Sequence, residues 1–267
     1  PPPQAPAAGP CASTARAPVA AAADRLYAPR IVEPTAQPVP PEGNAGGINI
    51  LNERPLHAAI KQWIAQPGDR LESLVDGYII DVVRGDLLIE VQTGNFGAIR
   101  DKLADLSARH PVRLVHPIAA EKWIVTRPAD GAERRRKSPR RGSLEDVFQE
   151  LVHLPDLMAE EDFSLEVLLI REEEVRRPAP PRGRWRRDWT REERRLVEVL
   201  ERRVFRTPAD LAALLPAGLP DPFTARDLAG QAGRPLRLAQ KVVYSLRRMD
   251  ALRICGKRGR SLLYTKL

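Results

Sequence analysis

The most informative segment for the fold is Tyr78-Ile-Ile-Asp81-Val-Val-Arg-Gly85-Asp-Leu-Leu-Ile-Glu90-Val-Gln92-Thr-Gly-Asn-Phe96. Glycine next to aspartate between two β-branched runs is typical of a tight β-hairpin, here with its turn at Arg84-Gly85-Asp86. Because side chains alternate along a strand, Glu90 and Gln92 share one face. If a two-residue loop closes the hairpin, Asp81 falls on that same face. Two carboxylates from neighbouring strands can hold a hard divalent cation, Mg²⁺ or Mn²⁺, which can activate water against a phosphate.

The neighbouring patterns alternate between helical and extended spacing. Pro67-Gly68 ends the first helical segment, and Pro155 bends or breaks a later one. A helix that joins two strands is typical of a parallel crossover. We therefore predict an α/β fold in which helices flank a mixed sheet. The expected helices cover residues 53–64, 98–109 and 144–158, the strands cover 71–83, 87–91, 112–115, 123–125 and 165–170, and a solvated basic loop covers 130–142.

Composition divides the chain into four parts. Residues 1–46 are rich in proline and alanine and poor in large apolar residues, so we expect a disordered tail. Residues 47–176 are expected to form the α/β domain. Residues 177–206 are expected to form a basic linker and helix, stiffened by Pro178-Ala-Pro-Pro181. Residues 207–267 are expected to form a small domain of short helices and a final hairpin.

Positive charge is concentrated towards the C-terminal end. The 267 residues contain 43 Lys and Arg against 35 Asp and Glu. From Arg176 onward there are 23 basic and 9 acidic residues, which leaves the preceding part mildly acidic. This asymmetry predicts a polyanionic partner. Nucleic acid is favoured, because no amphipathic surface helix with an aromatic face accompanies the charge.

Several other kinds of site are disfavoured. Cys11 and Cys255 stand far apart, so neither a disulfide framework nor a zinc site is expected. The four histidines show no metal-ligand spacing. No window approaches the roughly 20 apolar residues that span a bilayer, and the N-terminus lacks the features of a signal peptide. We expect a cytoplasmic protein without a membrane partner, while its oligomeric state is not indicated.

Asp81, the hairpin and Glu90-Val-Gln92, followed by a helix, resemble the PD-(D/E)XK nuclease superfamily, which has the restriction-endonuclease-like fold. Its members carry an aspartate on one core strand and an (Asp/Glu)-x-Lys motif on the next, and a preceding helix often provides a further acid. The resemblance covers about residues 48–127. It implies that Asp81 and Glu90 bind Mg²⁺ or Mn²⁺ and that Glu53 is the acid of the first helix.

Gln92 stands where the family usually has lysine. That lysine is thought to orient or deprotonate the attacking water and to offset transition-state charge, whereas glutamine can hydrogen-bond a water but carries no charge. Arg100 or Lys102 on the next helix could replace it. Asp76 is an alternative strand acid and metal ligand if the hairpin has a three-residue loop or a bulge, but alternation favours Asp81.

The C-terminal part resembles a winged helix-turn-helix over residues 207–267. Thr224 caps the first helix of the motif, residues 230–235 form the turn, and residues 236–248 form the recognition helix. The residues expected to pack inward are Leu236, Ala239, Val242, Val243 and Leu246. The residues expected to contact DNA are Arg237, Gln240, Lys241, Tyr244, Arg247 and Arg248 on the helix, and Lys257, Arg258 and Arg260 on the wing.

Together these patterns favour a metal-dependent endonuclease that hydrolyses phosphodiester bonds in DNA. In that interpretation the basic C-terminal part delivers the substrate. The alternative is a catalytically inactive DNA-binding or regulatory protein that keeps the nuclease fold as a scaffold. A third interpretation is an adaptor that uses the winged helix for protein contact.

Overall fold

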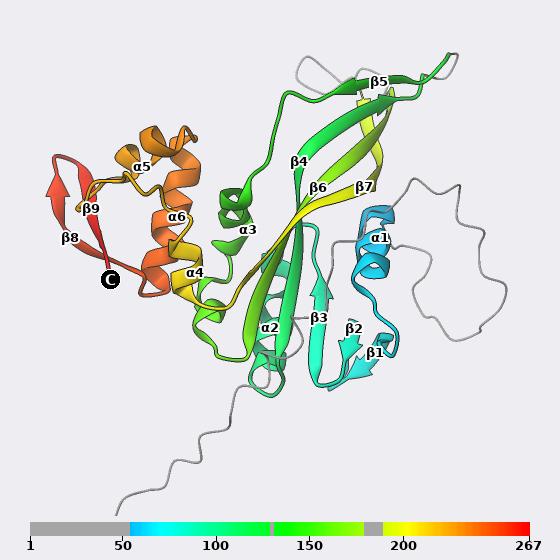
Figure 1. Cartoon of the computed structure of the whole chain (residues 1–267), viewed down its shortest axis with the longest axis horizontal. Helices are drawn as coiled ribbons and strands as arrows, with labels where there is room; N and C mark the ends of the chain where they lie inside the picture. Colours follow the sequence, from blue (N-terminus) through cyan, green and yellow to red (C-terminus); the bar gives the residue numbers. More distant parts are fainter. Residues whose placement is uncertain (1–53, 129–130, 179–188) are drawn as a thin grey trace, which may run out of the picture. The chain divides into compact units, whose positions relative to one another are not determined.

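The computed structural model describes residues 54–128, 131–178 and 189–267. The tail expected over residues 1–46, Glu53 and the proline spacer after Pro178 lie outside this part. Within it, helices flank a seven-stranded mixed sheet, as predicted, and a separate two-stranded hairpin follows (Figure 1). The strand order is β1-β2-β3-β4-β6-β7, and β5 pairs with β4. No helix among the described residues is long and apolar enough to cross a membrane.

The first elements follow the order helix, three strands, helix, strand. β1, β2 and β3 form an antiparallel meander, and β4 returns parallel to β3 after a helical crossover. Apolar periodicity predicted the two helices, the strand β3 and the first part of β4. The elements are α1 (Pro55–Ile64), β1 (Arg70–Val75), β2 (Tyr78–Arg84), β3 (Leu87–Val91), the 3-10 turn η4 (Phe96–Ile99), α2 (Arg100–Ser107) and β4 (Val112–Thr126).

A two-residue loop, Gly85-Asp86, closes the β2–β3 hairpin, which confirms the expected loop length. Val83 pairs with Leu88 across it, and Gly85 has the left-handed φ of 56° that such a loop requires. The single strand expected over residues 71–83 is wrong, because the chain reverses inside it. Asp76-Gly77 has φ values of 51° and 84° and turns β1 back onto β2.

The later strands are much longer than the sequence indicated. β4 runs unbroken through the residues expected as two separate strands. Part of the expected basic loop is strand β5, and most of the expected linker and helix over residues 177–206 is strand β7. These segments resemble loops because they are highly charged, but their charges pair across the sheet, as between Arg194 and Glu172 at 2.6 Å. The elements are β5 (Arg134–Lys137), β6 (Phe163–Pro178) and β7 (Trp189–Phe205).

The helix expected over residues 144–158 consists of three short pieces. It begins after Ser143, which forms a capping box with Asp146. The chain leaves helical geometry at Leu154, with φ −144°, directly before Pro155, so the expected break at this proline is confirmed. The pieces are η5 (Leu144–Val147), α3 (Phe148–Leu151) and η6 (Pro155–Ala159).

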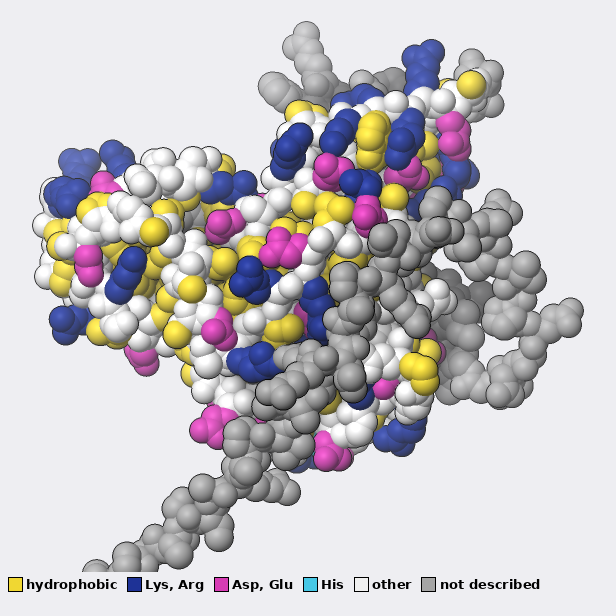
Figure 2. All heavy atoms as spheres, in the orientation of Figure 1, with side chains coloured by type: hydrophobic (Ala, Val, Ile, Leu, Met, Phe, Trp, Pro, Cys, Tyr) yellow, Lys and Arg dark blue, Asp and Glu magenta, His cyan; other side chains and the backbone are white. Residues whose placement is uncertain are grey.

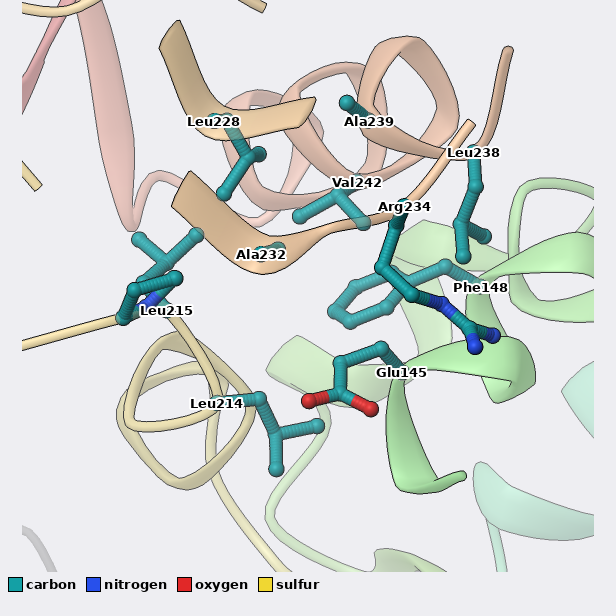
Figure 3. Close-up of a pocket in the computed structure, with 11 residues that line it drawn as sticks. Glu145, Phe148, Leu214, Leu215, Leu228, Ala232, Arg234, Leu238, Ala239 and Val242 are labelled. Carbon is teal, nitrogen blue, oxygen red and sulfur yellow. The ribbon is translucent and has the colours of Figure 1, made fainter. Parts of the chain in front are cut away.

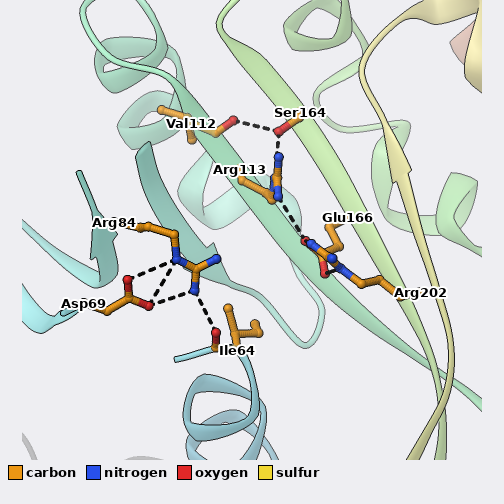
Figure 4. Close-up of polar contacts among 8 residues, drawn as sticks. All are labelled: Ile64, Asp69, Arg84, Val112, Arg113, Ser164, Glu166 and Arg202. Carbon is orange, nitrogen blue, oxygen red and sulfur yellow. Dashed lines mark hydrogen bonds and ion pairs between the residues drawn. The ribbon is translucent and has the colours of Figure 1, made fainter. Parts of the chain in front are cut away.

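Two hydrophobic clusters lie on opposite faces of the sheet, and α1 covers the smaller one. Leu56, Ile60 and Ile64 of α1 pack there on residues of β2, β3, β4 and β6. The Arg84 guanidinium fastens the end of this helix to the hairpin, because it donates to the Ile64 carbonyl and pairs with Asp69, both at 2.8 Å (Figure 4). The position of α1 over the β2–β3 hairpin is therefore fixed by packing and by charge.

Residues 207–267, which we call the C-terminal module, fold as three helices and a hairpin. Thr207 and Thr224 begin two of the helices with capping boxes, and Phe223 bridges to Tyr264 beside the hairpin. Leu236, predicted to face inward, is instead 36% exposed, because it is the first residue of α6 and Leu238 occupies the inward place. The elements are α4 (Pro208–Ala212), α5 (Ala225–Ala232), α6 (Leu236–Arg248), β8 (Leu252–Arg258) and β9 (Ser261–Lys266).

Candidate active site

Asp81 and Glu90 meet where the pairing of β2 with β3 ends. The last paired residues are Val82 and Ile89, so Asp81 and Glu90 occupy the next positions, one opposite the other. At these two positions, hydrogen bonds to the acidic side chains replace the backbone hydrogen bonds between the strands. The Val91 N–H donates to the Asp81 carboxylate at 2.8 Å, and the Asp81 N–H donates to the Glu90 carboxyl. Each acid is therefore held by the backbone of the opposite strand.

Helix α1 supplies a histidine to Asp81. His57 Nε2 lies 3.2 Å from Asp81 Oδ2, and the ammonium of Lys61, one turn further along, adds positive charge. Burial by itself raises the pKa of Asp81, but the His57 contact and charge and the Val91 N–H outweigh it and hold this pKa below its ordinary value. Asp81 is therefore ionised at neutral pH.

Helix α2 supplies a lysine to Glu90. Lys102 Nζ lies 2.7 Å from Glu90 Oε1 and donates to the Ile79 carbonyl, also at 2.7 Å. Glu90 is 6% exposed, and burial, followed by the charge of Asp81, raises its pKa to about 7, although Lys102 acts in the opposite direction. Near neutral pH the two acids therefore carry between one and two negative charges beside a lysine.

Gln92 lies at the end of β3 but turns away from the two acids. Its amide donates to the Asn95 carbonyl at 3.3 Å. Its own carbonyl accepts from His116 Nδ1 at 2.7 Å, and burial lowers the pKa of that histidine and keeps it neutral. Neither contact is with Asp81 or Glu90, and the lysine that lies beside the two acids is Lys102 of α2.

The other predicted acids are not brought to this point. Asp76 lies in the turn between β1 and β2 and pairs there with Arg109 at 2.7 Å and His110 at 2.8 Å. Arg109 and His110 hold the pKa of Asp76 below its ordinary value, the His110 hydrogen bond most of all. None of these contacts is with Glu90, and Glu53 lies outside the described residues.

The arrangement suits a cation that keeps most of its own water. Among the described residues, no three His, Cys, Asp or Glu side chains form a cluster able to hold a metal ion. A protein nevertheless usually supplies only one or two carboxylate ligands to Mg²⁺, which keeps several of its waters and binds substrate phosphate. The charge of Asp81 raises the pKa of Glu90, and a divalent cation would relieve that repulsion. The donor set therefore fits Mg²⁺ or Mn²⁺ and is too small for a closed structural site.

Residues 54–206, which contain this site, match the family model described as Domain of unknown function (DUF8091). The chain belongs to this family. A protein of Treponema pallidum (strain Nichols) is 36% identical to the chain over 222 residues, which are 82% of this chain and 87% of the relative. No solved structure matches the chain. The DUF8091 domain thus spans α1 to β7, and the C-terminal module follows it.

Two residues of the DUF8091 site were not singled out from the sequence. His57 and Lys61 stand four positions apart on α1, beside the apolar stripe of Leu56, Ile60 and Ile64. Residues at this spacing share a helix face, so a face that borders the buried stripe was a signal that they reach the sheet. The sequence could not indicate that Asp81 lies beneath them, because that contact depends on how α1 packs.

The C-terminal module packs on the DUF8091 domain around a small apolar hollow. Phe148 of α3, Leu214 after α4 and Val242 of α6 line it, with Arg234 and Glu145 as its polar lining (Figure 3). Arg234 also forms an ion pair with Asp146 of η5. The hollow belongs to the packing of the helices in this part of the chain.

Two residues of α6 predicted to contact DNA form polar contacts with the DUF8091 domain. Lys241 donates to the Gln149 carbonyl at 2.7 Å, and Arg248 Nη2 donates to both carboxylate oxygens of Asp156 at 2.7 Å. This side of α6 lies against α3 and η6, and its two cations are already engaged. The sequence places these residues on the helix surface but does not reveal that each binds a residue of the DUF8091 domain.

The other predicted contacts remain accessible. On the hairpin, Arg258 pairs with Asp227 of α5 at 3.0 Å, and Figure 2 shows Lys and Arg side chains gathered at the end of this hairpin. On α6 the accessible residues recur every three or four positions and form one stripe. The exposed residues are Arg237, Gln240, Tyr244 and Arg247 on α6 and Lys257, Arg258 and Arg260 on the hairpin.

The raised pKa of Glu90 predicts how stability depends on pH. Its folded-state pKa of about 7 exceeds the ordinary 4.5, so the stabilisation by the protonated acid is complete below pH 4.5 and is lost as pH rises through about 7. Glu90→Gln mimics the protonated acid and does not show this change. Between pH 4.5 and 8, in EDTA, the wild type should lose on the order of 2 kcal/mol of unfolding free energy relative to Glu90→Gln. Urea unfolding at a series of pH values measures it, and parallel curves for the two proteins would contradict it.

Proposed function

We propose that this DUF8091 protein is a metal-dependent endonuclease that hydrolyses phosphodiester bonds in DNA, with a restriction-endonuclease-like domain of the PD-(D/E)XK superfamily. The observation that carries the proposal is the meeting of Asp81, Glu90 and Lys102 at the end of the β2–β3 hairpin that lies away from its turn. It lies within the element order α1-β1-β2-β3-α2-β4, which agrees with the helix, hairpin, helix and strand of the resemblance.

Asp81 and Glu90 would hold Mg²⁺ or Mn²⁺ through their carboxylate oxygens. A bound cation supplies an activated water and offsets charge on the phosphate. Both acids come from strands and are fixed by backbone hydrogen bonds, so little reorganisation is needed when a cation binds. His57 keeps Asp81 ionised in the absence of metal, which prepares the site for a cation.

Lys102 supplies the positive charge that Gln92 lacks. Its ammonium already lies 2.7 Å from Glu90, and its bond to the Ile79 carbonyl fixes the end of the side chain. A lysine held in this way can offset negative charge that develops on a phosphate. The functional group thus reaches the site from α2 instead of β3.

The C-terminal module supports a DNA substrate, because its helices and hairpin follow the order of a winged helix. We expect Arg237→Gln/Arg247→Gln to weaken duplex binding and to lower the salt dependence of log Kd by about 2, since each arginine would neutralise about one phosphate. The matched control is Lys241→Gln/Arg248→Gln, which removes the same charge from the engaged side of α6 and should leave the slope unchanged. Fluorescence anisotropy over a salt series distinguishes them, and equal slopes for both pairs would refute this role of the stripe.

Mg²⁺- or Mn²⁺-dependent nicking of plasmid DNA, and its loss in Glu90→Gln, tests the proposal. The second candidate, a DNA-binding scaffold without catalysis, is favoured by one observation. Both acids are already engaged within the protein, Asp81 by His57 and Glu90 by Lys102. Salt-sensitive DNA binding without nicking, unchanged in Glu90→Gln, would support that candidate.

A further inference from the structure

Strand β5 is the most basic element of the DUF8091 domain. Its four residues are Arg134-Arg-Arg-Lys137, and all are exposed. It pairs with the distal part of β4, with Lys137 opposite Trp123, Arg136 opposite Ile124 and Arg134 opposite Thr126. Because partners across a ladder share a face, the four cations divide into two pairs on opposite faces of the sheet.

On one face, the cations are neutralised inside the molecule. Arg135 lies over the ring of Trp123, 4.0 Å from its centroid, and Lys137 is 5.8 Å from it. Arg135 also pairs with Glu173 at 2.8 Å and Lys137 with Glu121 at 3.1 Å. This pair serves to hold β5 on the sheet.

On the other face, the acidic side chains already form ion pairs with other basic residues. Lys122 pairs with Glu172 at 2.7 Å and with Glu174 at 3.1 Å. Arg194 also pairs with Glu172, and Arg176 with Glu174, each at 2.6 Å. Arg134 and Arg136 consequently have no acidic partner among the described residues.

The sheet face that carries Arg134 and Arg136 is the same face that α1 covers closer to Asp81 and Glu90. Along β6, Leu168 and Ile170 belong to the cluster under α1, and Glu172 and Glu174 continue the same alternation. Glu90 lies beside Leu114 of β4, and Ile124 and Thr126, opposite these two arginines, follow 10 and 12 residues later. At about 3.3 Å per residue the separation is roughly 33–40 Å, close to one turn of B-DNA at about 34–36 Å.

We propose that Arg134 and Arg136 form a second nucleic-acid contact surface, which binds phosphates of the duplex about one turn from the site of cleavage. The identity of this partner rests on the proposed function. An anionic bilayer fits the surface less well, because no exposed large hydrophobic side chain lies on β5 or on the part of β4 that pairs with it. The interaction would therefore be electrostatic and sensitive to salt.

The two faces of β5 provide a matched pair of variants for the test. Arg134→Gln/Arg136→Gln and Arg135→Gln/Lys137→Gln remove the same charge from the same strand, but from opposite faces. With the full chain and a labelled 30-base-pair duplex in EDTA, the first should weaken binding about tenfold and lower the salt slope by about 2. The second should change the affinity less than about twofold, because its cations are engaged within the protein.

Several outcomes would overturn the inference. Equal losses of affinity in the two variants would mean that binding depends on net charge alone. A wild type that binds no duplex would refute DNA as the partner of this surface. Tighter binding to phosphatidylserine vesicles than to duplex would assign the surface to a membrane. The inference and the proposed function fail separately. If the protein does not nick DNA but only Arg134→Gln/Arg136→Gln binds duplex more weakly, the contact surface is supported and the nuclease proposal is not. If Glu90→Gln abolishes nicking but the two β5 variants bind duplex equally, only the contact surface is refuted.

Discussion

Glu90→Gln should lower Mg²⁺-dependent nicking of supercoiled plasmid by on the order of 10³-fold, about 4 kcal/mol in activation free energy. The substitution keeps the size of the side chain and replaces an anionic oxygen donor with a neutral amide. Asp81→Asn should act similarly, because the two acids form one donor set. Initial rates of open-circle formation, with Mg²⁺ and separately with Mn²⁺, measure the effect.

Asp76→Asn is the matched control for these two variants. It removes a carboxylate from the same strand region, but its partners are Arg109 and His110, so nicking should remain within a few-fold of wild type. Thermal denaturation confirms that each variant is folded. The wild type should gain thermal stability with Mn²⁺, and Glu90→Gln should not. Nicking at the wild-type rate by folded Glu90→Gln would refute the site.

Lys102→Ala should lower nicking by about 10²-fold, because it removes a cation held where phosphate charge develops. It should also alter the pH profile. Lys102 lowers the pKa of Glu90, so its removal raises that pKa further. Metal ligands must be deprotonated, and the acidic limb of the pH–rate profile should therefore move to higher pH. Single-turnover rates between pH 5.5 and 9 would show both effects.

Lys102→Arg and Arg100→Ala complete the test of the lysine. Arginine keeps the charge at residue 102 and should restore part of the rate and return the acidic limb towards its wild-type position. Arg100 lies at the start of the same helix but pairs with Asp156, at 3.8 Å, so its removal should leave the pH profile unchanged. A pH profile that moved equally in Arg100→Ala would assign the effect to general helix charge.

The sequence predicted the hairpin and its two acids because both depend on local geometry. Gly85 supplies the positive φ of a two-residue loop, and alternation along the strands then sets Asp81 opposite Glu90. The turn at Asp76-Gly77 was missed, because apolar residues continue on both sides of it and hide the reversal. The local sequence was sufficient where a turn-forming residue and the alternation of side chains along the strands indicated the same structure.

Charged segments were assigned wrongly for one physical reason. β7 and β5 carry residues that are expected in solvent, so their sequences resemble a linker and a loop. In the sheet, Arg202 pairs with Glu166 of the neighbouring strand, a residue 36 positions away in the sequence, and such partners cannot be read from a local window. The same limit applies to α6, where the sequence does not indicate that Arg248 pairs with Asp156.

Residue order alone was enough to predict the α/β arrangement, the two-residue loop and the opposition of Asp81 and Glu90, because these follow from short-range geometry. Which cations reach the two acids was settled by packing. His57 and Lys102 come from helices on either side of the hairpin, and their approach depends on how α1 and α2 pack on the sheet. The electrostatic state of the site is therefore a property of the packed domain, because it is set by charges distant in sequence and adjacent in space.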